Sequence, residues 1–452
     1  MLLLGFPSEM ARAIAETYCI NANTAANLTD IMLRVPVSAR LVALALAVLT
    51  AGFLSYFSIR TALAAHYLGL NTLNGFEKAT QLEPSNAMNW YFLGRYWQFN
   101  FENPDLDRAV SAYRKALELD PRSANIWLDL ASAYEGEADI NAARTAFLNA
   151  KRVYPVSGDV AWRYGNFLLR QNELAAGFLE IRHAIEADPT RGLEAFEVLQ
   201  HFESDFDSIL DRGLPPIANV YIDAIWRLTD EGRTNQGLKV WSKLVALHPK
   251  LSSREVFFFV DGLLNNNQTG EAEKVWRQAV ALMDLPKVED APSSLIWDGG
   301  FETAVIGGGL AWRIQPWPNV MIGHDRSVRH SGMGALRIDF GVGENSDFAG
   351  VCQRVVLEPN ATYELSGWLR TREIAQGRGM FLQLAEPGMP WNRHAKTSEL
   401  AGTTEWTRVS TRWVSPDHPR LAEVCLARLS GLESNKVPAT VWVDDVSLLK
   451  LE

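Results

Sequence analysis

The first half of the chain carries a spacing of small and bulky residues that repeats every 34 positions. Each copy ends at a proline, with a small residue, a bulky residue and an alanine twelve, eight and five positions before it. These positions share one face of an α-helix, where small side chains let a neighbouring helix approach closely. A fixed period of this length predicts a stacked array of helix pairs. The prolines are Pro121, Pro155 and Pro189, preceded by Ala109, Ala143 and Gly177, by Tyr113, Phe147 and Ile181, and by Ala116, Ala150 and Ala184.

The pattern extends beyond these three copies. Upstream, Phe76 and Ala79 before Pro84 repeat it, and downstream it persists in weaker form up to Ala279. Residues 190–215 are irregular, and the run Gly213-Leu-Pro-Pro216 is expected to interrupt the stack. We therefore expect about five or six units over residues 68–286, with atypical units at the ends.

The first helices of these units resemble those of the tetratricopeptide repeat. Trp127, Leu130, Ala131 and Tyr134 stand where that family keeps Trp, Leu, Gly and Tyr. In the family the first helices line a concave groove that holds a peptide or a partner segment. Taken alone, each groove residue is equally well explained as solvated or packed surface. The resemblance implies a partner-binding groove formed by Tyr91, Arg95, Gln98, Asn125, Leu128, Glu135, Trp162, Asn166 and Arg170.

An uncharged segment of 17 residues, Leu41–Phe57, precedes the repeats. As a helix it is about 26 Å long, and extension from Pro36 towards residue 67 makes it long enough for a hydrocarbon core of about 30 Å. We expect a transmembrane helix within residues 36–67, with Arg60 reaching back to the membrane interface. A buried helix of a soluble core is one alternative. A cleaved signal peptide, processed at Ala62-Leu-Ala64, is another.

Positive charge around this segment predicts its orientation. Arg34 and Arg40 precede the segment, whereas Arg60 is the one close positive charge after it. The positive-inside rule therefore places the amino terminus in the cytoplasm and the repeats outside it, in a bacterial inner membrane. Residues 1–31 show no convincing pattern, and Met32 begins a compact positive segment before the apolar run. We interpret residues 1–31 as an unstructured or mis-assigned extension of a chain that starts at Met32.

The pattern of residues along the sequence changes after the repeats. Residues 287–294 are polar and contain proline, as expected of a linker. From residue 295 to 452, short β-rich runs alternate with Gly, Pro and Asn turns, which predicts an antiparallel sandwich. The fold class is thus multidomain, an all-α solenoid followed by an all-β jelly roll. The expected strands are Ala335–Phe340, Val351–Leu357, Thr362–Arg370, Met380–Leu384, Thr407–Val414, Ala422–Leu429 and Thr440–Leu449, with one more before them.

Several strands of this domain resemble those of jelly-roll carbohydrate-binding modules that contain a structural calcium. The opening Gly299-Gly-Phe-Glu302, the run Tyr363–Arg370 and the closing Val441-Trp-Val-Asp-Asp445 carry the resemblance. It implies that Glu302 and Asp444, with Asp445 as a substitute, hold one calcium ion. The alternative is that Glu302 caps a turn and the two aspartates face water. No other cofactor is expected.

The tryptophans of this domain fall into two groups. Trp368, Trp406 and Trp442 lie within expected strands, so we expect core packing for them. Trp317 and Trp391 lie in runs rich in turn formers, where an exposed indole can stack on a sugar. Asn392, Arg393 and His394 follow Trp391 as candidate hydrogen-bond partners. Equally, either loop tryptophan can fold back onto the protein as a plug.

Net charge, motifs and cysteine content argue against some classes of function. The net charge of −10 without a dense basic stripe argues against nucleic acid as the main partner. The sequence contains no HExxH, Gly-x-Ser-x-Gly or Walker motif, so we expect a protein that is not an enzyme. Cys352 and Cys425 both lie in expected strands and pair if those strands are neighbours. Free thiols are the preferred reading, because three cysteines make no dense framework.

These features together suggest a non-catalytic scaffold of the cell envelope. The repeats are expected to bind a protein partner and the sandwich a glycan or a protein, in polysaccharide synthesis or export. Two alternatives stay open. One is a glycan-binding receptor that uses the repeats as a stalk, and the other is an accessory subunit of a glycoside hydrolase.

Overall fold

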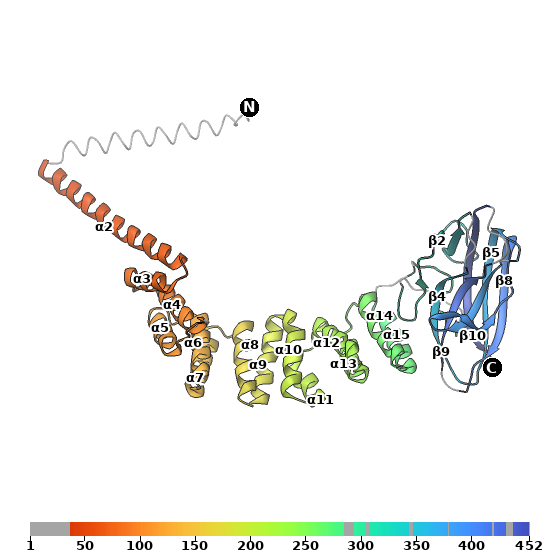
Figure 1. The fold of residues 1–452 in the computed structure, drawn as a ribbon, viewed down its shortest axis with the longest axis horizontal. Coiled ribbons are helices and arrows are strands. Elements are labelled where there is room, and N and C mark those ends of the chain that lie inside the picture. The colour runs from red at the N-terminus through yellow and green to blue at the C-terminus, as the bar shows by residue number, and fades with distance from the viewer. Residues whose placement is uncertain are drawn as a thin grey trace, which may run out of the picture. The chain divides into compact units, whose positions relative to one another are not determined.

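The structure is a computed structural model of the 452-residue chain. It describes residues 37–100, 102–283, 293–303, 305, 307–342, 347–377, 379–417, 420–430 and 437–451. Residues 1–31, the start at Met32, the arginine at 34 and most of the expected linker lie outside these ranges. The chain forms two compact units, Met1–Val160 and Ala161–Glu452. Helices precede strands along the whole chain, which confirms the predicted fold class (Figure 1).

The first unit consists of helices that pack in antiparallel pairs through small residues. Gly94 is such a residue, since a Cβ at this position would lie 2.7 Å from the Tyr113 ring. Side chains of Asn86, Asp105 and Asp139 cap the amino termini of successive helices, as short polar residues do. The helices are α2 (Val37–Gly69), α3 (Leu73–Leu82), α4 (Ala87–Phe99), α5 (Leu106–Leu119), α6 (Ala124–Gly136) and α7 (Ile140–Val153).

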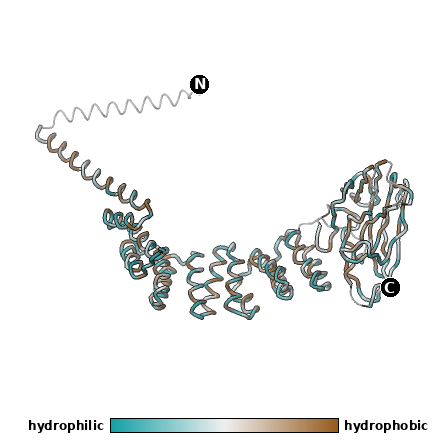
Figure 2. The backbone as a smooth tube through the Cα atoms, in the orientation of Figure 1, coloured by the Kyte–Doolittle hydropathy of each residue, from teal (hydrophilic) through white to brown (hydrophobic). Residues whose placement is uncertain are grey.

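Helix α2 is apolar along most of its length and continues directly into the first repeat (Figure 2). Leu41–Gly69 is long and apolar enough to cross a membrane, and none of its most apolar stretch is buried. The last turns of α2 pack on α3 instead. There, Arg60 Nε donates to the Leu82 carbonyl at 2.9 Å, and Thr61 Oγ1 donates to Glu83 Oε1 at 2.6 Å. Arg60 therefore contacts the carboxy end of α3, and its place at the membrane interface stays a prediction.

The second unit begins with further helix pairs around one continuous core. The boundary between the units falls within α8 (Gly158–Arg170). Residues of the region predicted to interrupt the stack, Phe196 and Ile209 among them, belong to the same core as Val220 and Phe259. The expected interruption is therefore wrong, because a short helix pair fills the gap. The further elements are α9 (Leu174–Ala187), η1 (Pro189–Arg191), α10 (Gly192–Phe202), α11 (Phe206–Ser208), η2 (Ile209–Gly213), α12 (Ala218–Asp230), α13 (Thr234–Ala246), α14 (Ser253–Asn265) and α15 (Thr269–Leu282).

The sandwich follows as two antiparallel five-stranded sheets, with strand orders β1-β4-β9-β6-β7 and β2-β3-β10-β5-β8. Alternate residues of each strand point into a common core, for example Val351, Leu382 and Val424 from the first sheet and Ile338 and Val443 from the second. All seven expected strands are present. The sheets also contain β1, β2 and β7. The strands are β1 (Arg313–Ile314), β2 (Val320–Asp325), β3 (Ala335–Phe340), β4 (Phe348–Leu357), β5 (Thr362–Ile374), β6 (Met380–Glu386), β7 (Met389–Lys396), β8 (Gly402–Val414), β9 (Arg420–Arg428) and β10 (Ala439–Leu451).

Candidate functional site

The predicted groove residues of the first unit form a connected network on helices α4 and α6. Tyr91 Oη donates to Asp129 Oδ2 at 2.9 Å, and Arg95 Nε lies 3.8 Å from the same oxygen. The Arg95 guanidinium also lies over the Tyr91 and Phe99 rings. Burial and the Asp129 charge raise the pKa of Tyr91 to about 12, so its hydroxyl stays a donor. The Arg95 side chain remains half exposed.

The other groove residues of this unit differ in accessibility. Asn125 is exposed, Glu135 is half-buried, and Leu128 is 1% exposed beneath them. Gln98 accepts a hydrogen bond from Tyr113 Oη at 2.7 Å, which ties α4 to α5. We therefore expect Asn125 and Glu135 to be available to a partner and Gln98 and Leu128 to support the surface.

In the second unit, the predicted groove residues lie on α8, and an aromatic pair lies further along. The Arg191 guanidinium lies over the half-buried Trp162 ring, and Asn166 Nδ2 donates to the Trp162 carbonyl at 2.9 Å. On α12 and α14, the Trp226 and Phe258 rings stack with centroids 4.0 Å apart. Sequence reasoning missed this pair. Trp226 is the ninth residue of α12, as Arg95 is of α4, so aligning the helix starts would have found Trp226. Phe258 is the sixth residue of α14, which is not a predicted groove position.

The groove positions of the last helix pair are already occupied by the sandwich. Phe257 and Asp261 are the fifth and ninth residues of α14, the positions that Tyr91 and Arg95 hold in α4. A Cβ on Gly308, in the loop that opens the sandwich, would lie 2.2 Å from the Phe257 ring. Glycine at this position lets the backbone of the loop lie directly against an aromatic ring.

Charged residues complete this junction. Asp261 Oδ1 accepts a hydrogen bond from Arg313 Nη2 at 2.6 Å and lies 3.6 Å from Arg354 Nη1. Trp276 of α15 meets Trp297 edge-on at 5.9 Å. Side chains of Val356 and Leu421, on the outer side of β4 and β9, pack against the solenoid core. The last repeat therefore covers part of one face of the sandwich.

Two clefts lie beside each other in the first unit, away from the predicted groove positions. One of about 750 Å³ is lined by α5, α6 and α7, with Trp127 in its wall, and one of about 650 Å³ includes Trp90. Each indole Nε1 donates at 2.9 Å to the carbonyl of a repeat proline, Pro84 or Pro121. Trp127 was predicted to be a signature residue of the repeat, and the two hydrogen bonds give Trp90 and Trp127 the same structural role.

The candidate calcium residues come together only in part. Glu302 Oε1 and Asp444 Oδ1 both lie within 4 Å of the place where a Cβ on Gly300 would stand. Asp444 is fully buried, and its Oδ2 accepts the amides of His330 and Ser331 at 2.7 and 3.1 Å. Burial raises the pKa of Asp444 to about 6. Glycine leaves room between the two carboxylates, so this pair fits a hard cation whose other ligands are carbonyl oxygens.

Asp445 is engaged elsewhere. Its Oδ2 lies 2.6 Å from His330 Nδ1, and its Oδ1 accepts a hydrogen bond from Ser331 Oγ at 2.7 Å. These contacts hold the loop before β3 against β10. Asp445 therefore holds this loop and does not join Glu302 and Asp444.

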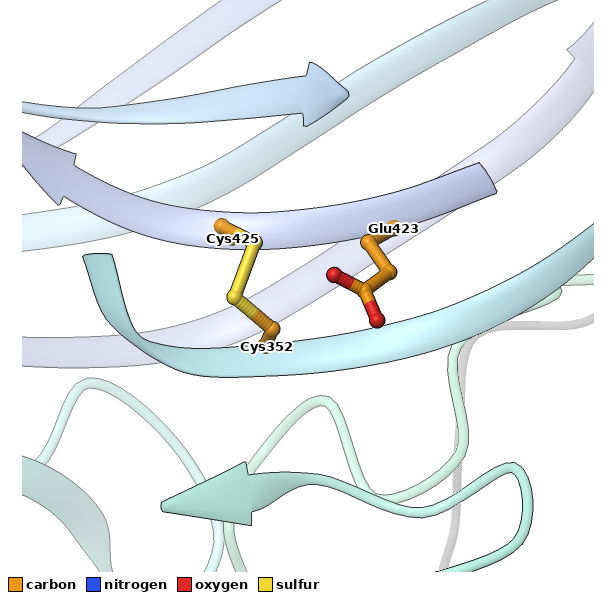
Figure 3. A group of neighbouring side chains, drawn as sticks. All are labelled: Cys352, Glu423 and Cys425. Carbon is orange, nitrogen blue, oxygen red and sulfur yellow. A yellow bond between two sulfur atoms is a disulfide. The ribbon is translucent and has the colours of Figure 1, made fainter. Parts of the chain in front are cut away.

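The two cysteines expected to be free thiols form a disulfide (Figure 3). Cys352 of β4 and Cys425 of β9 are directly paired across neighbouring antiparallel strands. The free-thiol prediction is wrong, because the strand order makes β4 and β9 neighbours and the register aligns the two residues. Glu423 lies beside the disulfide, within metal-ligand reach of both sulfur atoms. The bonded sulfurs are not thiolates, however, so this group does not offer the charge that a thiolate metal site needs.

The residues proposed to stack on sugar are placed differently from each other. Trp317 lies in the turn between β1 and β2 and meets the core residue Phe348 edge-on at 5.7 Å, so it acts largely as a plug. Trp391 lies in strand β7, not in a loop, and is 43% exposed. The expected loop position of Trp391 is wrong, because β7 tolerates proline and glycine around it at the sheet edge. Stacking of Trp391 on sugar stays a prediction.

The residues after Trp391 follow β7. Asn392 is exposed, and the Arg393 guanidinium lies over the Phe381 ring at 5.7 Å. His394 stacks on Trp413 at 5.5 Å, and burial lowers its pKa. The structure therefore brings Arg393 and His394 against aromatic rings of the protein and leaves Trp391 and Asn392 open to a ligand.

The strand tryptophans expected in the core lie on the outer face of the second sheet. Trp442 pairs directly with Arg337 of β3 and Arg370 of β5, whose side chains share its face of the sheet. Trp368 pairs with Arg408 of β8. This part of the prediction is wrong, since strand position alone does not tell which face an indole occupies. Trp442 is nonetheless buried, because arginine side chains cover it.

Comparisons with known proteins agree with the two halves of the fold. A tetratricopeptide repeat family model matches residues 102–123, which include α5. The chain is 29% identical over 206 residues to the tRNA(Glu)-specific nuclease WapA of Bacillus subtilis subsp. natto, covering 43% of this chain and 8% of that protein. It is 31% identical over 83 residues to Protein bimA of Emericella nidulans, covering 18% and 10%. The chain thus spans a small part of the length of these relatives.

Solved structures resemble each half separately. A structure described as "Family 16 Carbohydrate Binding Module-2" is 19% identical, with 34% of this chain and 99% of that chain covered and a TM-score of 0.25. YrrB, described as a TPR protein with an unusual peptide-binding site, is 16% identical, with 47% and 93% covered and a TM-score of 0.25. The described residues thus form helix pairs followed by an antiparallel sandwich, and the family model identifies a tetratricopeptide repeat at residues 102–123.

Proposed function

We propose that this chain is a membrane-anchored, non-catalytic scaffold of the bacterial envelope. Its repeats bind a protein partner, and its sandwich binds a glycan or a protein in polysaccharide synthesis or export. The main support is a contact within the chain. Phe257 and Asp261, at groove positions of α14, bind the surface of the sandwich. The same two positions of α4 carry Tyr91 and Arg95, so a surface of the same kind is available to a partner there.

The non-catalytic part of the proposal accounts for the nuclease relatives. The alignment with the WapA nuclease covers 8% of that protein. We propose that the shared part is a binding module and not the nuclease itself. The sequence motifs named above for metal-dependent and serine hydrolases are absent from this chain.

The anchor is supported by the way α2 ends. Cleavage after Ala64, as in a signal peptide, would remove Arg60 and Thr61, which hold α2 to α3. It would also remove the fully buried side chain of Ala64 itself. We therefore prefer an uncleaved transmembrane helix. The disulfide agrees with the orientation, because disulfides persist in oxidising compartments outside the cytoplasm.

Alkaline phosphatase fused after Glu452 is expected to be active, because this enzyme requires an oxidising compartment. The same fusion placed before Met32 is the matched control and is expected to be inactive. Carbonate extraction should leave the full-length protein in the membrane pellet. The reverse pattern of enzyme activity would contradict the orientation, and release of the protein by carbonate would contradict the anchor.

Replacing Arg95, Asn166 and Arg170 with alanine is expected to weaken partner binding. All three lie on first helices at partly or fully exposed sites, so we expect the melting temperature to change by no more than about 2 °C. Binding is measured by photo-crosslinking in intact membranes from a benzoylphenylalanine placed at Asn125, followed by identification of the adduct. The triple variant should lose most of the adduct that the parent chain gives.

A matched variant of the opposite helices controls for surface charge. Lys115, Arg152 and Lys274 are exposed on second helices, and their replacement by alanine should leave the adduct unchanged. Equal crosslinking in the groove variant and the parent would rule out the first helices as the partner-binding surface.

We also propose that Glu302 and Asp444 hold a structural calcium ion. The ion would supply positive charge beside Asp444, whose carboxylate is buried and is repelled by that of Asp445. Without it, the raised pKa of Asp444 means that this residue favours the folded state below its unfolded value near 3.8 and loses that contribution as the pH rises through about 6. A bound cation would offset this loss at neutral pH.

Calcium is expected to raise the melting temperature of the full chain by about 3–6 °C at pH 7.5 and by less at pH 5. The Asp444→Asn variant keeps the size of the side chain and should abolish the rise. Asp445→Asn is the control, because Asp445 contacts His330 and Ser331 instead. Equal melting temperatures in calcium and in chelator, with no metal found by elemental analysis, would exclude the site.

A further inference from the structure

The outer face of the sheet β2-β3-β10-β5-β8 combines arginine and tryptophan side chains. We call it the arginine–tryptophan face and define it by Arg337, Arg370, Arg372, Trp368, Trp406 and Trp442. Alternation along the strands places Trp442, Arg337 and Arg370 on one side of the sheet, while their neighbours Val441, Ile338 and Leu369 point into the core. None of these residues has a role in the junction with the solenoid or in the calcium pair.

Three guanidinium groups converge on one indole at the centre of this face. The Cζ atoms of Arg337 and Arg370 lie 5.8 Å from the centroid of Trp442, and that of Arg372 lies 5.5 Å away. Cation–π attraction stabilises each arginine over the ring, but the three like charges also repel one another. A group of this kind is most stable when anions share the space around it.

The carboxylates near this cluster are unevenly distributed. Arg337 lies 2.9 Å from an oxygen of Asp339 and 3.7 Å from one of Asp325. Arg370 lies 3.3 Å from Glu405, whose side chain is 84% exposed, so this pair contributes little. Arg372 donates to the Thr440 hydroxyl at 3.2 Å. Positive charge is therefore least balanced at Arg370 and Arg372.

Aromatic rings continue the face next to these arginines. His330 stacks on Trp368 with centroids 4.0 Å apart and meets Trp406 at 5.7 Å. Trp406 is half-buried and directly follows Glu405 in β8. An indole with one open surface suits the apolar side of a sugar ring.

We propose that the arginine–tryptophan face binds an acidic polysaccharide, one whose units carry carboxylates. A carboxylate accepts hydrogen bonds from Arg370 and Arg372, and a neighbouring sugar ring stacks on Trp406. Arginine suits this role because its planar fork donates two parallel hydrogen bonds to a carboxylate. The inference rests on the glycan-binding part of the proposed function and names the class of glycan. Nucleic acid is the alternative polyanion, and its binding is one of the contradicting outcomes of the test.

The test is isothermal titration calorimetry of the full-length chain in detergent with hexagalacturonate, an oligomer of a uronic acid. Maltohexaose, a neutral oligomer of the same length, is the reference. We expect hexagalacturonate to bind more tightly and its affinity to fall as salt is added. The double variant Arg370→Gln with Arg372→Gln should weaken binding at least about tenfold. Trp406→Leu should weaken it about threefold to tenfold.

Two further variants separate recognition from folding and from net charge. Arg370→Lys with Arg372→Lys keeps the charge but removes the fork, and it should lose part of the affinity. Arg108→Gln with Arg277→Gln removes two arginines that are 63% and 70% exposed on the repeats, and it should bind as the parent does. Melting curves of all variants should match the parent, and the lysine variant carries the test if the glutamine variant unfolds.

Three other binding results would each contradict the inference. If maltohexaose binds and hexagalacturonate does not, this inference fails while the glycan-binding part of the proposed function stands. If neither binds, both fail. If single-stranded oligodeoxythymidylate of equal charge binds as tightly and also depends on Arg370 and Arg372, the face is a general polyanion site and the inference is overturned.

Discussion

Replacing Cys352 and Cys425 with alanine is expected to lower the free energy of unfolding of the sandwich by about 4 kcal/mol. The disulfide joins residues separated by 73 positions, and closing a loop of that length restricts the unfolded chain considerably. Both side chains are also buried, so alanine removes packing from the face they share with Glu423 (Figure 3). Urea denaturation, followed by hydrogen exchange of amides in β4 and β9, measures the loss.

Two controls make this result specific. Cys19, which lies outside the described residues, should be replaceable by alanine without effect on the sandwich. The parent chain treated with reductant should behave like the double alanine variant. Three free thiols counted in denaturant without reductant would show that the bridge does not form in the protein.

The pairing of these cysteines shows where inference from sequence stops. Alternation and turn residues were enough to predict β3, β5 and β10, because each exposes one face and buries the other. They do not tell which strands become neighbours when the chain crosses between sheets. The order β1-β4-β9-β6-β7 joins strands far apart in sequence, and register then aligns Cys352 with Cys425. Both depend on packing of the whole domain.

The same reasoning explains the mixed outcome for aromatic residues. Repeat spacing predicted that one face of each second helix packs on a neighbouring helix, and Tyr113 does so against Gly94. A tryptophan in a strand has two faces available, and large side chains are stable on the outer one when arginines cover them, as on Trp442. Trp226 escaped attention for a different reason, since the pattern weakens downstream of the irregular region.

The contact between the last repeat and the sandwich could also not be predicted from the sequence. The groove positions were implied by the resemblance to the tetratricopeptide repeat, but that resemblance cannot show that one pair, Phe257 and Asp261, is filled by the chain itself. This contact determines which part of the chain should be used to measure glycan binding. Residues 295–452 studied alone would expose Trp297, Val356 and Leu421, which the last repeat covers. Glycan binding is therefore better measured on the full chain.

The Asp261→Arg variant is expected to weaken the contact between the last repeat and the sandwich by about 2–3 kcal/mol. Breaking a buried ion pair costs roughly 3–5 kcal/mol, and partial exposure of these side chains reduces that figure. Asp261 lies 2.6 Å from Arg313 and 3.6 Å from Arg354, with a fifth to a third of each side chain exposed. The new arginine would repel both.

Hydrogen exchange of α14 and of residues 307–313 measures this loss, and it should increase about 30-fold to 150-fold where these segments protect each other. A second substitution, Arg313→Asp in the same chain, should restore part of the protection by reversing the pair. Asp230→Arg, on an exposed acid of α12, is the matched control and should leave exchange at the junction unchanged. Unaltered exchange in Asp261→Arg would mean that the sandwich does not depend on the last repeat. The groove positions of α14 would then no longer serve as an example of binding within the chain.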